Sequence, residues 1–112
     1  MLAFELADLS AQQQQTTTAY LEFLRVAALS VGIYTLEAGS IDPQQPHSEA
    51  EVYYIVSGQS DIQVGAEVRS VKAGSIIFVE AGVSHKFLNI REKLLVLVFF
   101  APAEYTQKDS SV

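Results

Sequence analysis

The pattern of hydrophobic and polar positions predicts a chain built mainly of short β-strands. Residues 20–26 and 28–37 mix aromatic and β-branched side chains, and within the second segment the apolar positions 29, 31 and 33 alternate with small residues. Side chains of a strand point alternately to its two faces, so this period of two is typical of a half-buried strand. We therefore expect a strand in each segment.

The same pattern recurs further along the chain, with a turn signal such as a glycine between successive segments. The spacing of these segments, roughly eight to ten residues, is typical of an all-β sandwich or barrel. The further predicted strands are residues 51–57 (closed by Gly58), 60–64, 68–71, 75–79, 85–89 and 94–100, with a hairpin turn at residues 65–67. We predict an all-β, single-domain antiparallel barrel.

The segment 94–100 is apolar on both of its faces, so both faces need to be covered. One face would turn inward and the other would form an exposed apolar patch, and the sequence leaves open which is which. We predict that a second copy covers this patch in a homodimer, in which the edge of the strand at 20–26 also finds a partner. The two alternative sets are Leu94, Val96, Val98 and Phe100, and Leu95, Leu97 and Phe99.

The two ends of the chain differ in character from its centre. Residues 4–10 suggest a short helical turn or an irregular lead-in, and residues 12–18 are a polar run of Gln and Thr that we interpret as a surface connector. We therefore predict three parts: a lead-in and connector at 1–19, the barrel at 20–106 and a loose tail at 107–112.

Charge and composition narrow the classes of partner and compartment. Seven Lys and Arg stand against thirteen Asp and Glu, and the net charge of −6 argues against nucleic-acid binding. The absence of cysteine excludes disulfides and thiolate metal sites and suits a reducing compartment. The acidic start of the chain does not resemble a signal peptide, and no apolar run is long enough to span a membrane. We expect a cytoplasmic protein without a membrane partner.

Candidate chemistry is concentrated in the segment 45–58. His47, one of only two histidines, stands four residues before Glu51, beside a predicted strand. Imidazole and carboxylate side chains in this setting suggest a nitrogen and oxygen metal site. On a continuous strand Gln45, His47, Glu49 and Glu51 share one face, and a barrel would bring His85 from a distant strand to meet them. Because Glu49 and Glu51 are two positions apart, the alternation of side chains along a strand does not decide which of them is the ligand.

Two groups of residues give this chain a resemblance to the cupin superfamily, and specifically to its small single-domain members. The first group matches the first cupin motif, with Gln45 in the place of a metal-binding histidine. The second group matches the second motif, with Glu80 in the place of its proline. The groups are Gly39, Gln45, His47, Glu51 and Gly58, and Gly74, Gly82, His85 and Asn89.

The resemblance implies a jelly-roll barrel and a metal site. Its ligands would be His47, Glu51 and His85, with Gln45 as a weak ligand through its amide oxygen or as a hydrogen-bonding neighbour. Two imidazoles and one carboxylate suit one divalent transition metal ion, Fe, Mn, Ni, Cu or Zn, and leave coordination positions open. We expect binding to weaken as the pH falls from 6.5 towards 5.

The family geometry further implies that His47 ends one strand and that Glu51 begins the next. Glu49 would then lie at the rim of the site, as the candidate general base. Three functions follow from this site. We favour a metal-dependent enzyme, of dioxygenase, isomerase or lyase type, that acts on a small oxygen-rich organic molecule. The alternatives are a binding or sensing module that uses the metal as an anchor, and a metal-free structural barrel.

Overall fold

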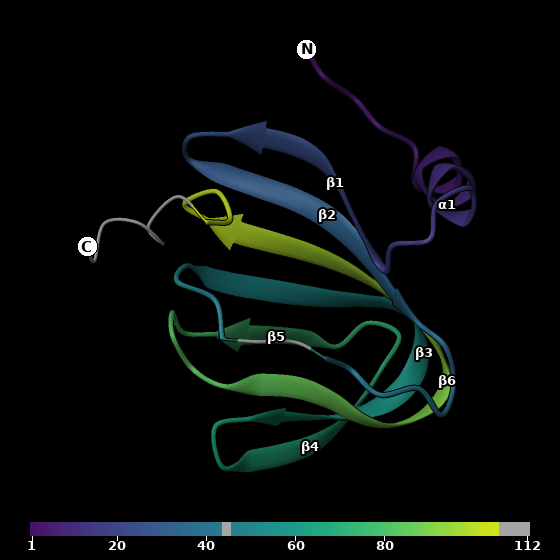
Figure 1. Cartoon of the computed structure of the whole chain (residues 1–112), viewed down its shortest axis with the longest axis vertical. Helices are drawn as coiled ribbons and strands as arrows, with labels where there is room; N and C mark the ends of the chain where they lie inside the picture. The colour runs from purple at the N-terminus through teal and green to yellow at the C-terminus, as the bar shows by residue number, and fades with distance from the viewer. Residues whose placement is uncertain (44–45, 106–112) are drawn as a thin grey trace.

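The structure is a computed structural model that describes residues 1–43 and 46–105. Within these two ranges the chain forms one short helix and six strands of a single antiparallel sheet, which confirms the all-β prediction. The sheet follows the order β1-β2-β6-β3-β4, with β5 paired to β3 (Figure 1). The elements are α1 (Leu6–Gln14), β1 (Tyr20–Val26), β2 (Leu29–Leu36), β3 (Ala50–Val64), β4 (Glu67–Lys72), β5 (Ile76–Val79) and β6 (His85–Ala101).

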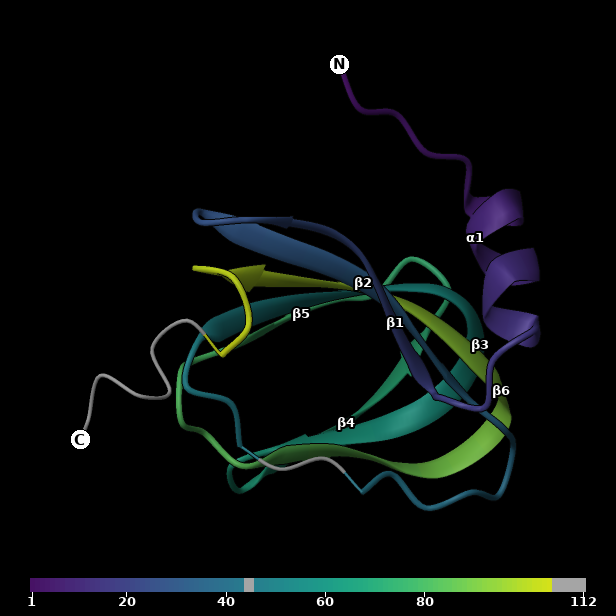
Figure 2. The same cartoon turned by 45° about the horizontal axis from the view of Figure 1, so that its top comes forward.

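Two long strands, β3 and β6, pair along their whole length and create the two layers of the barrel. Both bend near the middle, where the β3–β6 register shifts between Ile55 and Asp61. On one side of the bend β3 pairs with β5 and β6 with β2, and on the other side β3 pairs with β4. Figure 2 shows β1, β2 and β5 in the upper layer and β4 in the lower layer. The sheet therefore folds over on itself and encloses a core.

The sequence predicted four separate strands where the structure has these two. Gly58 was expected to end a strand, but it lies inside β3 at the bend, with φ of +101°. A Cβ atom at this position would lie 2.3 Å from the carbonyl oxygen of Lys93 in β6. The glycine therefore permits a close approach of two backbones, which is the role of glycine in a bent strand rather than at a strand end.

The core is formed by the inward faces of the strands. Of the two sets that the sequence left open, Leu94, Val96, Val98 and Phe100 point inward and are at most 2% exposed. Leu95 and Leu97 are partly covered, and Phe99 is 39% exposed on the outer face. Complete burial of each large apolar side chain stabilises the fold by about 1.5–3 kcal/mol. The inward set therefore anchors β6 to the core.

Helix α1 lies beside β1 and takes in the first part of the polar run at 12–18, while the exposed residues 15–18 connect the helix to β1 (Figure 1). The helix continues through Gln14, and Gln13 is buried. The Gln13 amide donates to the carbonyl oxygens of Ala19 and Ile33, at 2.5 and 3.4 Å. Gln13 follows Leu9 by four residues, so both lie on the helix face that packs on the sheet. No helix in the described ranges has the length and hydrophobicity needed to cross a membrane.

Candidate metal centre

His85 is the first residue of β6, and its ring is held in one orientation. Its Nδ1 lies 2.8 Å from the Val83 carbonyl oxygen, which can only accept a hydrogen bond. Nδ1 therefore carries a proton, and Nε2 points to Glu51, with 2.6 Å between Nε2 and Oε1. A backbone carbonyl that fixes the tautomer of a histidine in this way is common for metal ligands.

Glu51 lies near the start of β3, with its side chain turned into the barrel, and it is only 2% exposed. Tyr53 is two residues further along the same strand and therefore lies on the same face. Its hydroxyl donates to Glu51 Oε1 over 3.0 Å. The Glu51 carboxylate is thus oriented by a neighbour in its own strand.

His47 lies in the segment before β3, which is tied to the second motif. Its carbonyl oxygen accepts a hydrogen bond from the Gly82 amide over 2.7 Å. Upstream, the buried Asp42 accepts from the Tyr34 hydroxyl at 2.6 Å and from the Phe87 amide at 2.9 Å. These bonds fix the positions of Asp42 and of the His47 backbone. The sequence prediction that His47 ends a strand is wrong, because β3 is preceded by irregular backbone.

The three predicted main ligands come together. Ligand atoms of His47, Glu51 and His85 all lie within 4.8 Å of one another, and His47 Nδ1 is 3.6 Å from Glu51 Oε1. Two of the atoms in this cluster, His47 Nδ1 and Glu51 Oε2, are buried and have no hydrogen-bond partner among the described residues. Unsatisfied buried polar atoms are rare and costly. Two imidazoles and a carboxylate with such unused atoms fit a divalent transition metal ion.

The electrostatics of the cluster are dominated by the contacts between the rings and the carboxylates. Burial alone would lower the pKa of His47, but its contacts with the Glu104 and Glu51 carboxylates raise the pKa to about 9. Burial also opposes the protonation of His85, but the contact with Glu51 raises its pKa. Burial would raise the pKa of Glu51, and the two histidines lower it instead. In the absence of metal, the carboxylates therefore favour the protonated form of both rings.

Glu49 does not lie at the rim, as the sequence suggested. It is 1% exposed and accepts hydrogen bonds from the Ser48 hydroxyl and, over 2.7 Å, from the Tyr105 amide. Its carboxylate ties the start of β3 to the segment that follows β6. Gln45, the other candidate from the first motif, lies outside the described residues.

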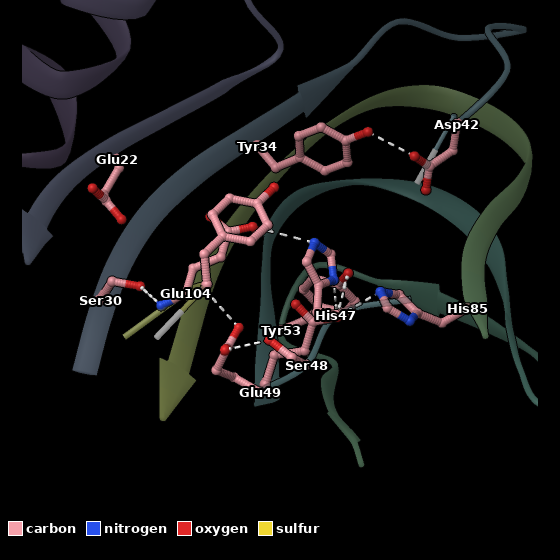
Figure 3. Close-up of polar contacts among 12 residues, drawn as sticks. Glu22, Ser30, Tyr34, Asp42, His47, Ser48, Glu49, Tyr53, His85 and Glu104 are labelled. Atoms are coloured by element: carbon pink, nitrogen blue, oxygen red, sulfur yellow. Dashed lines mark hydrogen bonds and ion pairs between the residues drawn. The ribbon is translucent and has the colours of Figure 1, made fainter. Parts of the chain in front are cut away.

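Sequence reasoning missed Glu104, which follows β6. Its Oε2 lies 3.2 Å from His47 Nε2, on the opposite side of the ring from the other ligands (Figure 3). The backbone of Glu104 is fixed by the Ser30 hydroxyl and by Arg25. No motif marks this residue; the one available signal was its place just after Pro102, where the chain leaves the last strand at the mouth of the barrel.

A cavity of about 250 Å³ lies beside the cluster. Its wall is mainly aromatic and aliphatic, with His47 and Glu104 as charged or polar members. A larger hollow of about 610 Å³ lies beside α1, but its lining is mostly Gln, Thr and Ser and includes none of the three clustered ligands. We therefore associate function with the smaller cavity. Its lining residues are Tyr20, Tyr34, His47, Tyr53, Val98, Phe100, Glu104 and Tyr105.

Comparison with known proteins agrees with this geometry. The sequence pattern of the Cupin domain family matches residues 32–100, which begin within β2 and end within β6. The chain belongs to the cupin family. A protein of uncharacterised function from Streptomyces coelicolor is 50% identical over 104 residues, which cover 93% of this chain and 99% of that protein.

Solved structures of other proteins show the same fold at low sequence identity. A protein from Klebsiella pneumoniae with a double-stranded β-helix domain is 18% identical, with a TM-score of 0.74, and the match covers 91% of this chain and 90% of that one. The DMSP lyase DddQ of Ruegeria pomeroyi is 22% identical, with a TM-score of 0.64 over 68% of this chain. This cupin chain spans 39% of the length of the lyase chain.

Proposed function

We propose that this cupin is a metal-dependent enzyme that acts on a small, oxygen-bearing organic molecule. The observation that carries the proposal is the position of the cavity. Its wall includes His47 and also Tyr53, whose hydroxyl bonds Glu51. A molecule in the cavity would therefore lie directly beside the cluster of His47, Glu51 and His85.

These three residues would hold one divalent transition metal ion, Fe, Mn, Ni, Cu or Zn. Such an ion, when bound, supplies a Lewis acid that polarises an oxygen atom of a substrate. The chain itself contributes the shape of the site. Tyr34, Val98 and Phe100 give the cavity a largely apolar wall, and Tyr53 holds the Glu51 carboxylate in place. Surroundings of low polarity strengthen the electrostatic interactions within a site.

The candidate enzyme types are a dioxygenase, an isomerase and a lyase. The similarity to the DMSP lyase supports lyase chemistry as one of these candidates, because that fold is shared. Fold alone does not determine function, however. The volume of about 250 Å³ restricts the substrate to a small molecule.

One observation favours a binding or sensing module as the second candidate. The described lining of the cavity contains a single carboxylate, Glu104, and that carboxylate already contacts His47. Glu49, which we had expected to act as a general base, is buried and accepts bonds from Ser48 and Tyr105. A molecule could thus be bound beside the metal without a proton-accepting group to act on it.

Metal analysis and a turnover assay test the proposal together. Protein purified without chelator should contain about one transition metal ion per chain by elemental analysis. The metal-loaded protein should then consume dioxygen with, or convert, at least one member of a panel of small enols, ketones and carboxylates. Binding of a panel member without turnover would favour the sensing module. No metal after purification, and no uptake of Fe, Mn, Ni, Cu or Zn, would leave the structural barrel.

A further inference from the structure

The contact between Glu104 and His47 joins the end of the barrel to the candidate metal centre. Glu104 Oε2 lies 3.2 Å from His47 Nε2, and both side chains are largely buried, with 9% and 13% of their surface exposed. The other ring nitrogen, Nδ1, is buried without a hydrogen-bond partner among the described residues and lies 3.6 Å from Glu51 Oε1. The two nitrogens of His47 therefore face different groups.

The backbone holds Glu104 in this position. Its amide donates to the Ser30 hydroxyl over 2.9 Å, and its carbonyl oxygen accepts from Arg25 Nη2 over 2.5 Å. The preceding amide, that of Ala103, donates to the Ala27 carbonyl oxygen over 3.4 Å. Three bonds from β1, β2 and their connection thus place the carboxylate at the ring. The contact between Glu104 and His47 is therefore supported by the backbone as well as by the Glu104 side chain.

An ionised carboxylate can only accept hydrogen bonds. The nitrogen beside it must therefore carry the proton, and in a neutral imidazole the other nitrogen then has the free lone pair. For His47 the protonated atom is Nε2, and the lone pair is on Nδ1, the atom that faces Glu51.

From this geometry we propose that Glu104 is a positioning residue that makes His47 bind the metal ion through Nδ1. The inference rests on the proposed metal binding and adds the atom through which one ligand acts. Carboxylates that accept a bond from the second nitrogen of a metal-binding histidine fix its tautomer and strengthen its binding, and their loss weakens affinity about 10- to 100-fold. Glu104 supplies such a carboxylate from outside both cupin motifs.

Substitution Glu104→Gln tests this role with little change in shape. The new amide can offer an N–H group to Nε2, which would move the ring proton to Nδ1 and block the ligand atom. We expect the zinc dissociation constant, measured by calorimetry at pH 8, to rise about 10- to 100-fold. A control keeps the Glu104 carboxylate: Glu67→Gln removes an exposed acidic charge from β4. This control should bind zinc within about threefold of the unaltered protein, in line with the modest effect of surface charges.

A spectroscopic measurement on the unaltered protein tests the same inference without relying on a variant. Long-range ¹⁵N–¹H NMR spectra of the zinc complex should show His47 with a proton on Nε2 and zinc on Nδ1. Zinc on Nε2 of His47, or unchanged affinity in the Glu104→Gln variant, would overturn the inference while leaving the proposed metal binding intact. Equal weakening by Glu67→Gln would reduce the effect of Glu104 to a general loss of negative charge and also overturn the inference. Failure of the unaltered protein to bind zinc would overturn both this inference and the proposed metal binding.

Discussion

At the scale of single residues, two glutamates that the sequence could not separate have different surroundings. Glu51 lies in the cluster with both histidines, and Glu49 accepts bonds from Ser48 and Tyr105 away from it. The parity of a continuous strand predicted the same face for both, but Glu49 lies before β3 begins, where parity does not apply. Strand parity therefore could not separate the two glutamates, and the family geometry wrongly placed Glu49 at the rim, whereas the motif spacing correctly brought His47, Glu51 and His85 together.

This difference predicts opposite effects of the same substitution. Glu51→Gln removes an anionic ligand and should weaken zinc binding by more than about 100-fold, since even changes to supporting residues cost 10- to 100-fold. Glu49→Gln should leave zinc binding within a fewfold of normal. It should lower the free energy of unfolding by about 1–3 kcal/mol, because it weakens charge-assisted bonds at a buried site. Calorimetric zinc titration and urea unfolding measure the two effects, and a Glu49→Gln variant that loses zinc would contradict the assignment.

The raised pKa of His47 predicts how stability and metal binding depend on pH. The pKa is 6.5 in the unfolded chain and about 9 in the folded chain, so its stabilising effect is complete below pH 6.5 and is lost as the pH rises through 9. Chelator-treated protein should therefore become less stable between pH 6.5 and 9. Because a metal ion must displace the same proton, zinc affinity should increase over that window, above the range of pH 5 to 6.5 that free imidazole suggested.

Thermal unfolding of chelator-treated protein at several pH values checks the first part of this prediction. The Glu51 carboxylate contributes in the opposite sense, because its pKa is lowered and its effect is lost as the pH falls below 4.5. A melting temperature that stays constant or rises from pH 6.5 to 9 would show that His47 does not hold its proton in the folded protein.

At the scale of elements, the sequence located the strands well but divided the longest ones. The ranges 20–26 and 68–71 agree with β1 and β4, and the second range is bounded by turn glycines, Gly65 and Gly74, on both sides. In contrast, β3 and β6 continue through a bend that the sequence marked as a boundary. Gly58 is compatible with either a turn or a bend, and only the approach of Lys93 from a distant strand decides between them. Such long-range contacts are not visible in a local pattern.

Gly58→Ala tests the close approach at the bend. Gly58 and Gly74 have similar backbone angles, with φ of +101° and +94°, but a Cβ at Gly74 would meet nothing within 4 Å. Both Ala substitutions should incur the strain of a positive φ, about 1–3 kcal/mol. Only Gly58→Ala adds the clash with Lys93, so it should lower the free energy of unfolding further than Gly74→Ala does, as measured in urea. An equal loss of unfolding free energy in the two variants would mean that the bend tolerates a side chain.

At the scale of the whole molecule, the outer face of the sheet carries an apolar patch. The strand register aligns Phe99 with Val52 and Phe78, and Leu97 with Tyr54 and Ile76, across β6, β3 and β5. Four of these side chains remain exposed, namely Tyr54 and Phe99 at 39%, Phe78 at 60% and Ile76 at 68%. A contiguous exposed patch of this kind is typical of a protein–protein interface. We propose that a second copy of the chain covers this face in a homodimer.

Light scattering at tens of micromolar protein should give the mass of a dimer. The double substitution Ile76→Glu and Phe78→Glu should convert it to a folded monomer, because two charges would be buried in the interface. The control Val68→Glu alters a side chain of β4 that is 56% exposed and lies beyond the bend, and it should leave the dimer unchanged. A monomer in the unaltered protein would contradict the proposed dimer.

The central claim is that His47, Glu51 and His85 form a metal site, and anomalous X-ray scattering tests it most directly. Crystals grown at pH 8 with zinc, and measured on both sides of the zinc absorption edge, should show one strong anomalous peak per chain. The account predicts that this peak lies about 2.0–2.2 Å from one ligand atom of each of these three residues. A peak at another position, or no peak at these side chains, would contradict the account.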